Sequence, residues 1–315
     1  MSEQFLRKKL PSNLIESGWK NTLNLFLLDW AVIIGAAFTA SQMHHFAITT
    51  MAIFLIASRQ HALFLIVHEG AHFHLSKSKS TNDLLSNLFA GWPIGVSTTR
   101  FREHHWKHHN HTNTEMDPDW VRKSKDPNWK FPKARKNFWM EFIPPYFRGQ
   151  GALEMLFMFK IIGPEKRERY KAAVFYVCVG SVLSLTATWS YFFTFWLVPY
   201  LTVLPILNKV RSIVEHLALP NTNTLNGSRN IYGSPVESFF FGPHGNSLHL
   251  IHHLYPNVPW HKIETTRKYL IQNDDNFKIH AHENLGYFLP NQNSVYRDLV
   301  KSNQGKGLHY EQNAA

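Results

Sequence analysis

Histidines in three short patterns are the residues of this sequence best suited to chemistry. The patterns are HEGAH with His68 and His72, HWKHH with His105, His108 and His109, and HLIHH with His249, His252 and His253. Residues three and four apart on a helix share a face, so HxxxH is expected to direct two imidazoles, and HxxHH three, toward one point. A single histidine is usually an ordinary polar side chain, but the repetition favours metal binding. The sequence therefore predicts a centre that can hold more than one metal ion.

The pattern HEGAH also matches H-E-x-x-H, in which two histidines bind zinc and the glutamate is the general base of a metalloprotease. One catalytic zinc needs three protein ligands and an open position, so this interpretation leaves two HxxHH patterns without a role. Another zinc hydrolase and a histidine-lined metal transporter or sensor are further alternatives. Transport is disfavoured because the histidines lie past the ends of the apolar segments and not along them.

The composition favours a membrane protein. Aromatic residues make up 14% of the 315 residues, while the mean hydropathy is only −0.25, so part of the chain is expected outside the lipid. The net charge is +11, but no nucleic-acid-binding motif accompanies it, and nucleic acid is not an expected partner. The single cysteine, Cys178, excludes an intrachain disulfide framework, a CxxC pair and cysteine-ligated iron within one chain.

Four apolar stretches predict an all-α integral membrane protein, because a spanning helix needs about 20 apolar residues. They cover about 23–40, 47–67, 172–188 and 190–207 and form two hairpins. The first contains Asp29, and the second is interrupted by Arg59, Gln60 and His61. We expect one domain over 1–315, with a histidine-rich cap formed by 68–171 and 208–282 and a polar tail over 283–315. Within the cap, a new helix is expected to begin near Ser97.

The distribution of positive charge predicts the orientation in the membrane. Lys and Arg precede the first apolar stretch and follow the fourth, whereas 41–46 and 188–190 contain neither. The positive-inside rule then places both termini and every histidine pattern in the cytoplasm, with the protein in the inner or plasma membrane if it is bacterial. No cleaved signal peptide is expected.

The motifs together resemble the membrane-bound fatty-acid desaturase and hydroxylase superfamily, the diiron enzymes with three histidine boxes. In that superfamily an HxxxH box follows the first membrane hairpin, an HxxHH box comes some thirty residues later, and another HxxHH box follows the second hairpin. The text FREHHWKHHNHTNTEMDPDW is similar to the second-box region of bacterial desaturases. HHLYPNVPW is similar to the segment after the third box in bacterial desaturases and carotenoid ketolases. The resemblance spans about 20–270.

The resemblance implies two non-haem irons in the cytoplasmic cap and a set of nine ligands. These are His68, His72, His105, His108, His109, His216, His249, His252 and His253, where His216 in VEHLALP is the ninth histidine that the superfamily often supplies. His104, His111 and His244 adjoin the boxes and are expected to form hydrogen bonds around the ligands. Acyl-CoA desaturases of the animal type have an asparagine four residues before the ninth histidine, where this chain has Ser212, so the resemblance does not extend to acyl-CoA as substrate.

The resemblance also implies an oxidoreductase that uses dioxygen and electrons from outside the chain. The expected reaction is insertion of a double bond into a fatty-acyl chain, linked to a lipid or a carrier. Hydroxylation or ketolation of a lipid, a carotenoid or a small natural-product precursor is the alternative within the superfamily. No GxGxxG loop or haem domain is recognisable, so the expected electron donor is a separate ferredoxin-type protein with its reductase.

Overall fold

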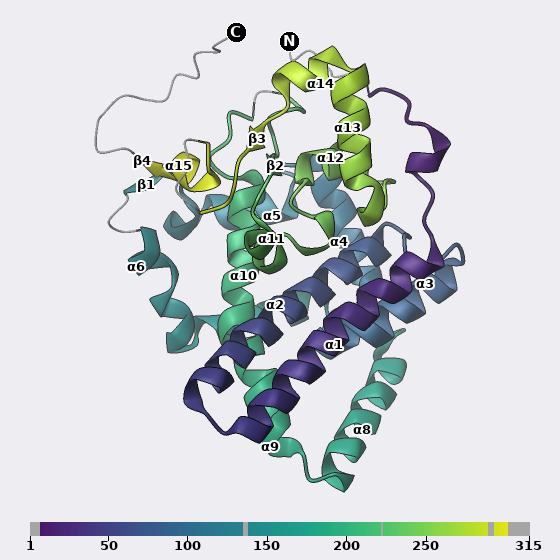
Figure 1. Cartoon of the computed structure of the whole chain (residues 1–315), viewed down its shortest axis with the longest axis vertical. Helices are drawn as coiled ribbons and strands as arrows, with labels where there is room; N and C mark the ends of the chain where they lie inside the picture. The colour runs from purple at the N-terminus through teal and green to yellow at the C-terminus, as the bar shows by residue number, and fades with distance from the viewer. Residues whose placement is uncertain (1–6, 135–137, 222, 289–292, 302–315) are drawn as a thin grey trace.

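The computed structural model describes residues 7–134, 138–221, 223–288 and 293–301, and helices dominate them (Figure 1). In chain order the α-helices are α1 (Trp19–Met43), α2 (Phe46–Ala71), α3 (Lys79–Ser86), α4 (Thr98–His111), α5 (Pro118–Ser124), α6 (Phe138–Phe142), α7 (Gly151–Ile162), α8 (Arg169–Leu185), α9 (Trp189–Phe192), α10 (Val198–His216), α11 (Pro235–Phe241), α12 (His249–Leu254), α13 (Ile263–Asn273), α14 (Asp275–His280) and α15 (Val295–Leu299). Short 3-10 or π-helical turns are η1 (Ser12–Leu14), η2 (Asn87–Gly91), η3 (Trp92–Ile94), η4 (Pro127–Trp129), η5 (Tyr146–Gln150), η6 (Phe193–Leu197), η7 (Pro243–Gly245) and η8 (Trp260–Lys262).

Strands make only a minor contribution to the described part of the fold. They are β1 (Lys133–Ala134), β2 (Asn230–Ile231), β3 (Glu283–Asn284) and β4 (Val300–Lys301). β1 pairs with β4 and β2 pairs with β3, both in parallel. The helical class predicted from the sequence is therefore confirmed.

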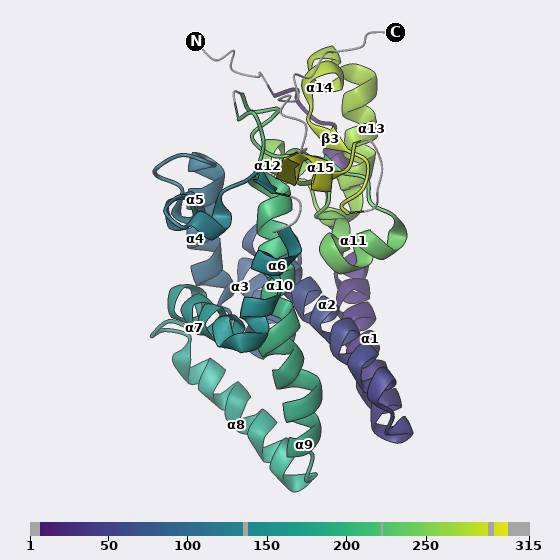
Figure 2. The same ribbon diagram turned by 90° about the vertical axis from the view of Figure 1, so that its left-hand side faces the viewer.

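Among the described residues, three helical segments are long and apolar enough to cross a membrane: Asn21–Met43, Phe46–Ala71 and Trp189–His216. The predicted span at 172–188 corresponds to α8, which has 17 residues and begins at Arg169. That length falls short of the roughly 20 residues of a typical spanning helix, so the four-span arrangement stays a prediction. Figures 1 and 2 show α8 and α10 diverging from their connection at α9, while α1 and α2 run side by side.

The helices that contain two of the predicted spans continue beyond the predicted ends. α2 runs past 67 to Ala71 and α10 runs past 207 to His216, so parts of the predicted cap belong to these helices. The charged residues near both ends remain helical because they are buried and paired inside the protein. Lys209 and Glu215, for example, expose only 4% and 5% of their surface. As a result, α2 and α10 carry His68 and His216 as helical residues.

The polar residues that interrupt the apolar stretches contact one another across helices. Nη1 of Arg59 in α2 lies 3.0 Å from Oδ1 of Asp29 in α1, and both side chains are fully buried. Nε2 of His244 in η7 lies 2.8 Å from Oδ2 of the same aspartate. Asp29 and Arg59 therefore join the first hairpin to the cap. Their pairing offsets the free-energy cost of removing both charges from water.

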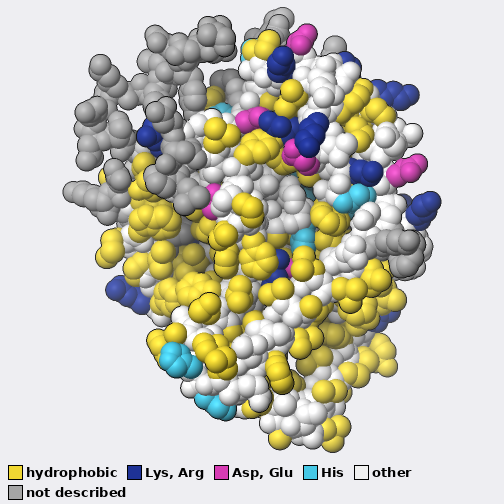
Figure 3. Space-filling model, in the orientation of Figure 1, with side chains coloured by type: hydrophobic (Ala, Val, Ile, Leu, Met, Phe, Trp, Pro, Cys, Tyr) yellow, Lys and Arg dark blue, Asp and Glu magenta, His cyan; other side chains and the backbone are white. Residues whose placement is uncertain are grey.

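The segment α7 lies between the histidine-bearing helices and α8. It packs against α10 and α4, while Leu153, Leu156 and Phe159 on its other face are exposed. The close approach to α10 depends on Gly151, since a Cβ there would meet the carbonyl oxygen of Leu201 at 2.2 Å. An exposed apolar face of this kind suits the membrane interface. Figure 3 shows hydrophobic side chains covering most of the lower face, whereas most visible charges lie in the upper part.

Part of the polar tail expected from residue 283 is folded. Residues 293–301 fold back onto the protein through α15 and β4, and Val295 and Leu299 are fully buried. They pack with Ile213 and Val214 of α10, because apolar residues at this spacing give the short helix a buried face. Residues 302–315 of the predicted tail lie outside the described residues.

Candidate metal centre

Four helices bring the predicted ligands together from distant parts of the chain. The end of α2 supplies His68 and His72, α4 supplies the HWKHH histidines, the end of α10 supplies His216, and α12 supplies the HLIHH histidines. α4 begins where predicted, because Ser97 caps it by accepting a hydrogen bond from the backbone N–H of Arg100. All nine side chains named from the sequence lie in two neighbouring groups.

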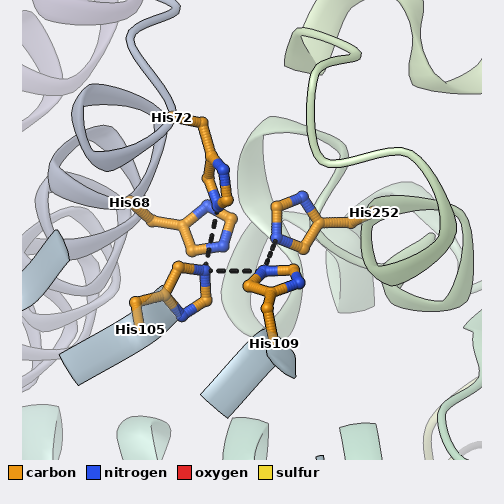
Figure 4. A group of neighbouring side chains, drawn as sticks. All are labelled: His68, His72, His105, His109 and His252. Carbon is orange, nitrogen blue, oxygen red and sulfur yellow. Dashed lines mark hydrogen bonds between the residues drawn. The ribbon is translucent and has the colours of Figure 1, made fainter. Parts of the chain in front are cut away.

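The first group, called here the five-histidine group, contains His68, His72, His105, His109 and His252 (Figure 4). One ligand nitrogen from each lies within 4.8 Å of all the others. The Nε2 atoms form a chain, with 3.0 Å between His72 and His105, 3.0 Å between His105 and His109, and 2.9 Å between His109 and His252. Such convergence of nitrogen atoms from α2, α4 and α12 suits a single metal ion.

The second group, called the four-histidine group, contains His108, His216, His249 and His253. Its Nε2 atoms also form a chain, with 3.2 Å between His108 and His216, 3.0 Å between His216 and His249, and 3.1 Å between His249 and His253. Oε2 of Glu215 lies 3.4 Å from Nε2 of His249. A carboxylate therefore adjoins this group alongside its four imidazoles.

Each HxxHH pattern is divided between the two groups, which corrects the expectation that it directs three imidazoles to one point. His105 and His109 join the five-histidine group and His108 joins the other; His249 and His253 join the four-histidine group and His252 joins the five-histidine group. Successive helical residues are about 100° apart, so positions i+3 and i+4 flank the direction of residue i on opposite sides. The two helices α4 and α12 thus each contribute to both groups.

The electrostatic setting favours the neutral form of three of these imidazoles, those of His105, His252 and His253. Burial, followed by the neighbouring His109 and His68, lowers the pKa of His105 well below its usual value. Burial is also the largest cause of the lowered pKa of His252 and of His253. A neutral imidazole offers a nitrogen lone pair, which is the form that binds a metal.

The donor set fits iron. Nε2 of His68 is buried and has no hydrogen-bond partner among the described residues, although it lies in the five-histidine group. A bound ion supplies the partner that such a buried nitrogen lacks. Imidazole nitrogen suits iron, copper, nickel and zinc, but a single tetrahedral zinc uses four ligands at most. Nine imidazoles in two groups therefore fit two ions better than one.

Two residues behind the ligands, Asp117 and Thr112, were not identified from the sequence. Nδ1 of His108 lies 3.0 Å from Oδ2 of Asp117, which is almost fully buried. Nδ1 of His253 lies 3.3 Å from Oγ1 of Thr112. Such partners set the orientation and tautomer of metal-binding histidines. The only local signal for Asp117 is the sequence Asp-Pro, which marks the N-cap of α5.

The glutamate of HEGAH does not face the metal groups. Oε2 of Glu69 accepts hydrogen bonds from Nδ1 of His74 at 2.9 Å and from the backbone N–H of Trp260 at 3.1 Å. Oε1 lies 3.7 Å from Nδ1 of His68, while Nε2 of the same ring remains without a partner. Glu69 thus lies behind His68 and belongs to neither metal group.

The three further histidines near the boxes belong to neither group. Nε2 of His104 bonds to Asp119 at 3.0 Å, and Nε2 of His244 bonds to Asp29. His111 ends α4 and has no side-chain hydrogen bond within the described ranges. No hydrogen bond among the described residues joins these side chains to a ligand histidine, so their expected role around the ligands stays a prediction.

One cavity reaches both groups. It has a volume of about 180 Å³ and is lined by His105 of the five-histidine group and by His108 and His216 of the other. Phe64, Phe101, Met158, Ile161 and Ile162 form its apolar wall, and Asn208, Arg211 and Glu215 lie on the α10 side. A larger cavity of about 720 Å³ lies among α1, η2, α8 and η6 and has no histidine in its lining. A third cavity, of about 420 Å³, is lined by His216 and shares His216 and Lys123 with the first. Of these three cavities, the first is the one lined by residues of both metal groups.

Comparison with known proteins gives a consistent result across most of the chain. The family model described as fatty acid desaturase matches residues 25–283. A dihydrorhizobitoxine desaturase from Bradyrhizobium elkanii is 27% identical over 276 residues, which cover 80% of this chain and 76% of that protein. An sn-1 acyl-lipid omega-3 desaturase (ferredoxin) from Synechocystis sp. is 24% identical over 281 residues, or 82% of this chain and 77% of that protein.

Proposed function

Because this chain belongs to the fatty acid desaturase family and is an oxidoreductase, we propose that it is an oxygen-dependent diiron desaturase. It introduces a double bond into a saturated carbon chain. The nine histidines of the two groups hold the irons, five at one and four at the other. The observation that carries this assignment is the division of nine buried imidazoles into two groups within one small volume.

The proposed reaction removes two hydrogen atoms from adjacent carbons. It reduces dioxygen to two molecules of water, and so it also consumes two electrons and two protons from outside. Protein side chains lack an oxidant strong enough for an unactivated C–H bond, and iron bound in the two groups supplies this chemistry. The chain itself orients the imidazoles through Asp117, Thr112 and Glu69, and its apolar wall keeps water from the reacting carbons.

The electrons come from a separate protein in this proposal. Within residues 7–134, 138–221, 223–288 and 293–301, the single cysteine Cys178 lies in α8 and contacts neither metal group. The Synechocystis relative is named as a ferredoxin-dependent type. We therefore propose a ferredoxin-type donor with its reductase, which docks on the cap. The cap and both termini face the cytoplasm, as the positive-inside rule predicts.

The relatives have names that place their substrates in different classes. One is named for an acyl lipid and the other for dihydrorhizobitoxine. The fatty-acyl chain predicted from the resemblance therefore stays a prediction. The cavity of about 180 Å³ is smaller than the roughly 300–1,000 Å³ of sites for drug-sized ligands, so only a short carbon segment fits beside the irons. Hydroxylation or ketolation in the same centre is the alternative outcome of the same hydrogen abstraction.

Mass spectrometry of cells with and without the gene tests the proposal directly. Lipids and small metabolites are compared, and an inactive His105→Ala variant serves as the matched control for expression of the protein. We expect a product that is lighter than its precursor by two hydrogen atoms and that disappears in the variant. A product heavier by one oxygen atom, with no alkene, would show that the enzyme catalyses hydroxylation and not desaturation.

A further inference from the structure

We infer that the cavity beside the metal groups binds a compact organic acid, whose free carboxylate is held by the guanidinium of Arg211. This inference rests on the proposed desaturase function and names the substrate class of that site. The carboxylate would lie on the α10 side of the cavity, and the alkyl part would extend along the apolar wall toward His105 and His108.

Arg211 has the geometry of a carboxylate anchor. It lies one helical turn before Glu215 in α10, and its Nε donates a hydrogen bond to Oε1 of that residue across 2.8 Å. Its side chain is only 13% exposed, and its two terminal nitrogens have no hydrogen-bond partner among the residues described. The terminal edge of a guanidinium donates two parallel hydrogen bonds to a carboxylate. Arg211 lines the cavity, and this edge of its guanidinium has no partner among the described residues.

Asn208 supplies a further donor on the same face of α10. Its Oδ1 is occupied, because Nδ1 of His61 lies 3.0 Å away. Its Nδ2 has no partner in the part of the chain that the structure describes, and the residue lines the cavity. The other cation of the cavity, Lys123, is instead engaged by Oγ of Ser212 and by Asp119 at 3.9 Å. Arg211 and Asn208 thus keep N–H donors that are available for an anion.

The remaining lining fits a short alkyl group. The guanidinium of Arg211 lies 5.6 Å from the ring of Phe64, where the apolar wall begins. The volume of about 180 Å³ is below the roughly 300–1,000 Å³ of sites for drug-sized ligands. A long acyl chain would have to extend beyond this cavity, into the adjoining one of about 420 Å³ that shares Lys123 and His216 with it. An ester-linked acyl group lacks the charge that Arg211 recognises, so a short free acid fits this cavity best.

Binding of hexanoate, methyl hexanoate and hexadecanoate to the iron-loaded protein tests this inference without turnover. Calorimetry in detergent, corrected with empty micelles, gives each dissociation constant. Hydrogen bonds to a charged group are worth about 1.5–3 kcal/mol, so hexanoate should bind roughly tenfold or more tightly than its methyl ester. Hexadecanoate should bind more weakly than hexanoate. Equal affinity of acid and ester, or tighter binding of hexadecanoate, would overturn the inference and leave the desaturase proposal intact.

Variants separate recognition of the acid from support of the metal centre. Arg211→Lys keeps the charge but loses the planar edge, so the preference for hexanoate over the ester should fall several-fold. Asn208→Asp keeps an oxygen for His61 and places a negative charge beside the carboxylate, so hexanoate binding should weaken while ester binding is unchanged. Arg100→Gln, which removes a cation bonded to backbone carbonyls outside the cavity, is the control. An unchanged preference in both variants, at unchanged iron content, would contradict the role of Arg211.

Discussion

Nδ1 of His108 donates a hydrogen bond to Oδ2 of Asp117 across 3.0 Å, and this contact directs Nε2 of the same ring into the four-histidine group. The carboxylate is itself fixed, because it accepts hydrogen bonds from the backbone N–H groups of Asn113 and Asp119 at 2.9 Å each. A loop and the start of α5 are thereby tied to one ligand of the proposed metal centre.

Asp117→Asn should lower iron affinity by about 10- to 100-fold, as loss of such a partner typically does. The amide is a weaker acceptor than the carboxylate and holds His108 less firmly in the required tautomer. Iron retention during dialysis against a chelator measures the effect. Asp126→Asn is the matched control, because Asp126 also caps a short helical turn but lies outside both metal groups. Equal iron retention in both variants would contradict the assigned role of Asp117.

His253→Ala should reduce bound iron by about half and abolish turnover, because it removes a ligand of the four-histidine group and none of the other. The protein should still insert in the membrane, since the substitution lies in α12, outside the candidate spanning segments. His111→Ala is the control, because His111 adjoins a box but belongs to neither group. Full iron content and activity in His253→Ala would show that His253 is not a ligand of the centre.

Glu69→Gln should cause a partial loss of activity that follows the loss of iron. The amide of the variant would still offer an oxygen to its neighbours but would hold His68 less well. A protease general base contributes about 10² to 10⁴ in rate, so its loss would remove nearly all activity with the metal still bound. Activity and iron content measured on the same preparation distinguish these outcomes. Near-complete inactivation at unchanged iron content would count against the positioning role.

The sequence predicted which histidines lie together but not how they are divided. Three patterns and the resemblance at His216 named all nine side chains of the two groups. The division was missed because positions i+3 and i+4 were treated as one direction, although they lie about 100° apart around a helix. Asp117 could not be found from histidine spacing, since its role depends on the turn between α4 and α5.

The helix ends and the cavity could not be predicted from the sequence patterns either. Charged residues near the ends of α2 and α10 suggested that these segments are exposed to solvent, whereas Glu215 is buried and paired with Arg211. The cavity combines side chains from α2, α4, α5, α7 and α10, so only the packing of these helices reveals it. Sequence periodicity defines faces of single helices and contains no information on such a junction.

Reporter fusions test the proposed orientation. Reporters after Ala315 and near Lys125 should both read cytoplasmic, and one near Ser190 should read external, because Lys and Arg flank the cap side of the apolar segments. A fusion near His45, in the connection between α1 and α2, provides a second external point. Opposite readings at Lys125 and Ala315 would show that the number of spans differs from the prediction.

The metal content of the purified protein tests the central claim most directly. Elemental analysis, combined with Mössbauer spectroscopy of protein enriched in the active iron isotope, reports the number of irons and the environment of each. We predict two irons per chain, little zinc, and two signals of equal area, because one iron would have five imidazoles and the other would have four with Glu215 nearby. One zinc per chain with no iron would contradict the diiron centre and the desaturase function built on it.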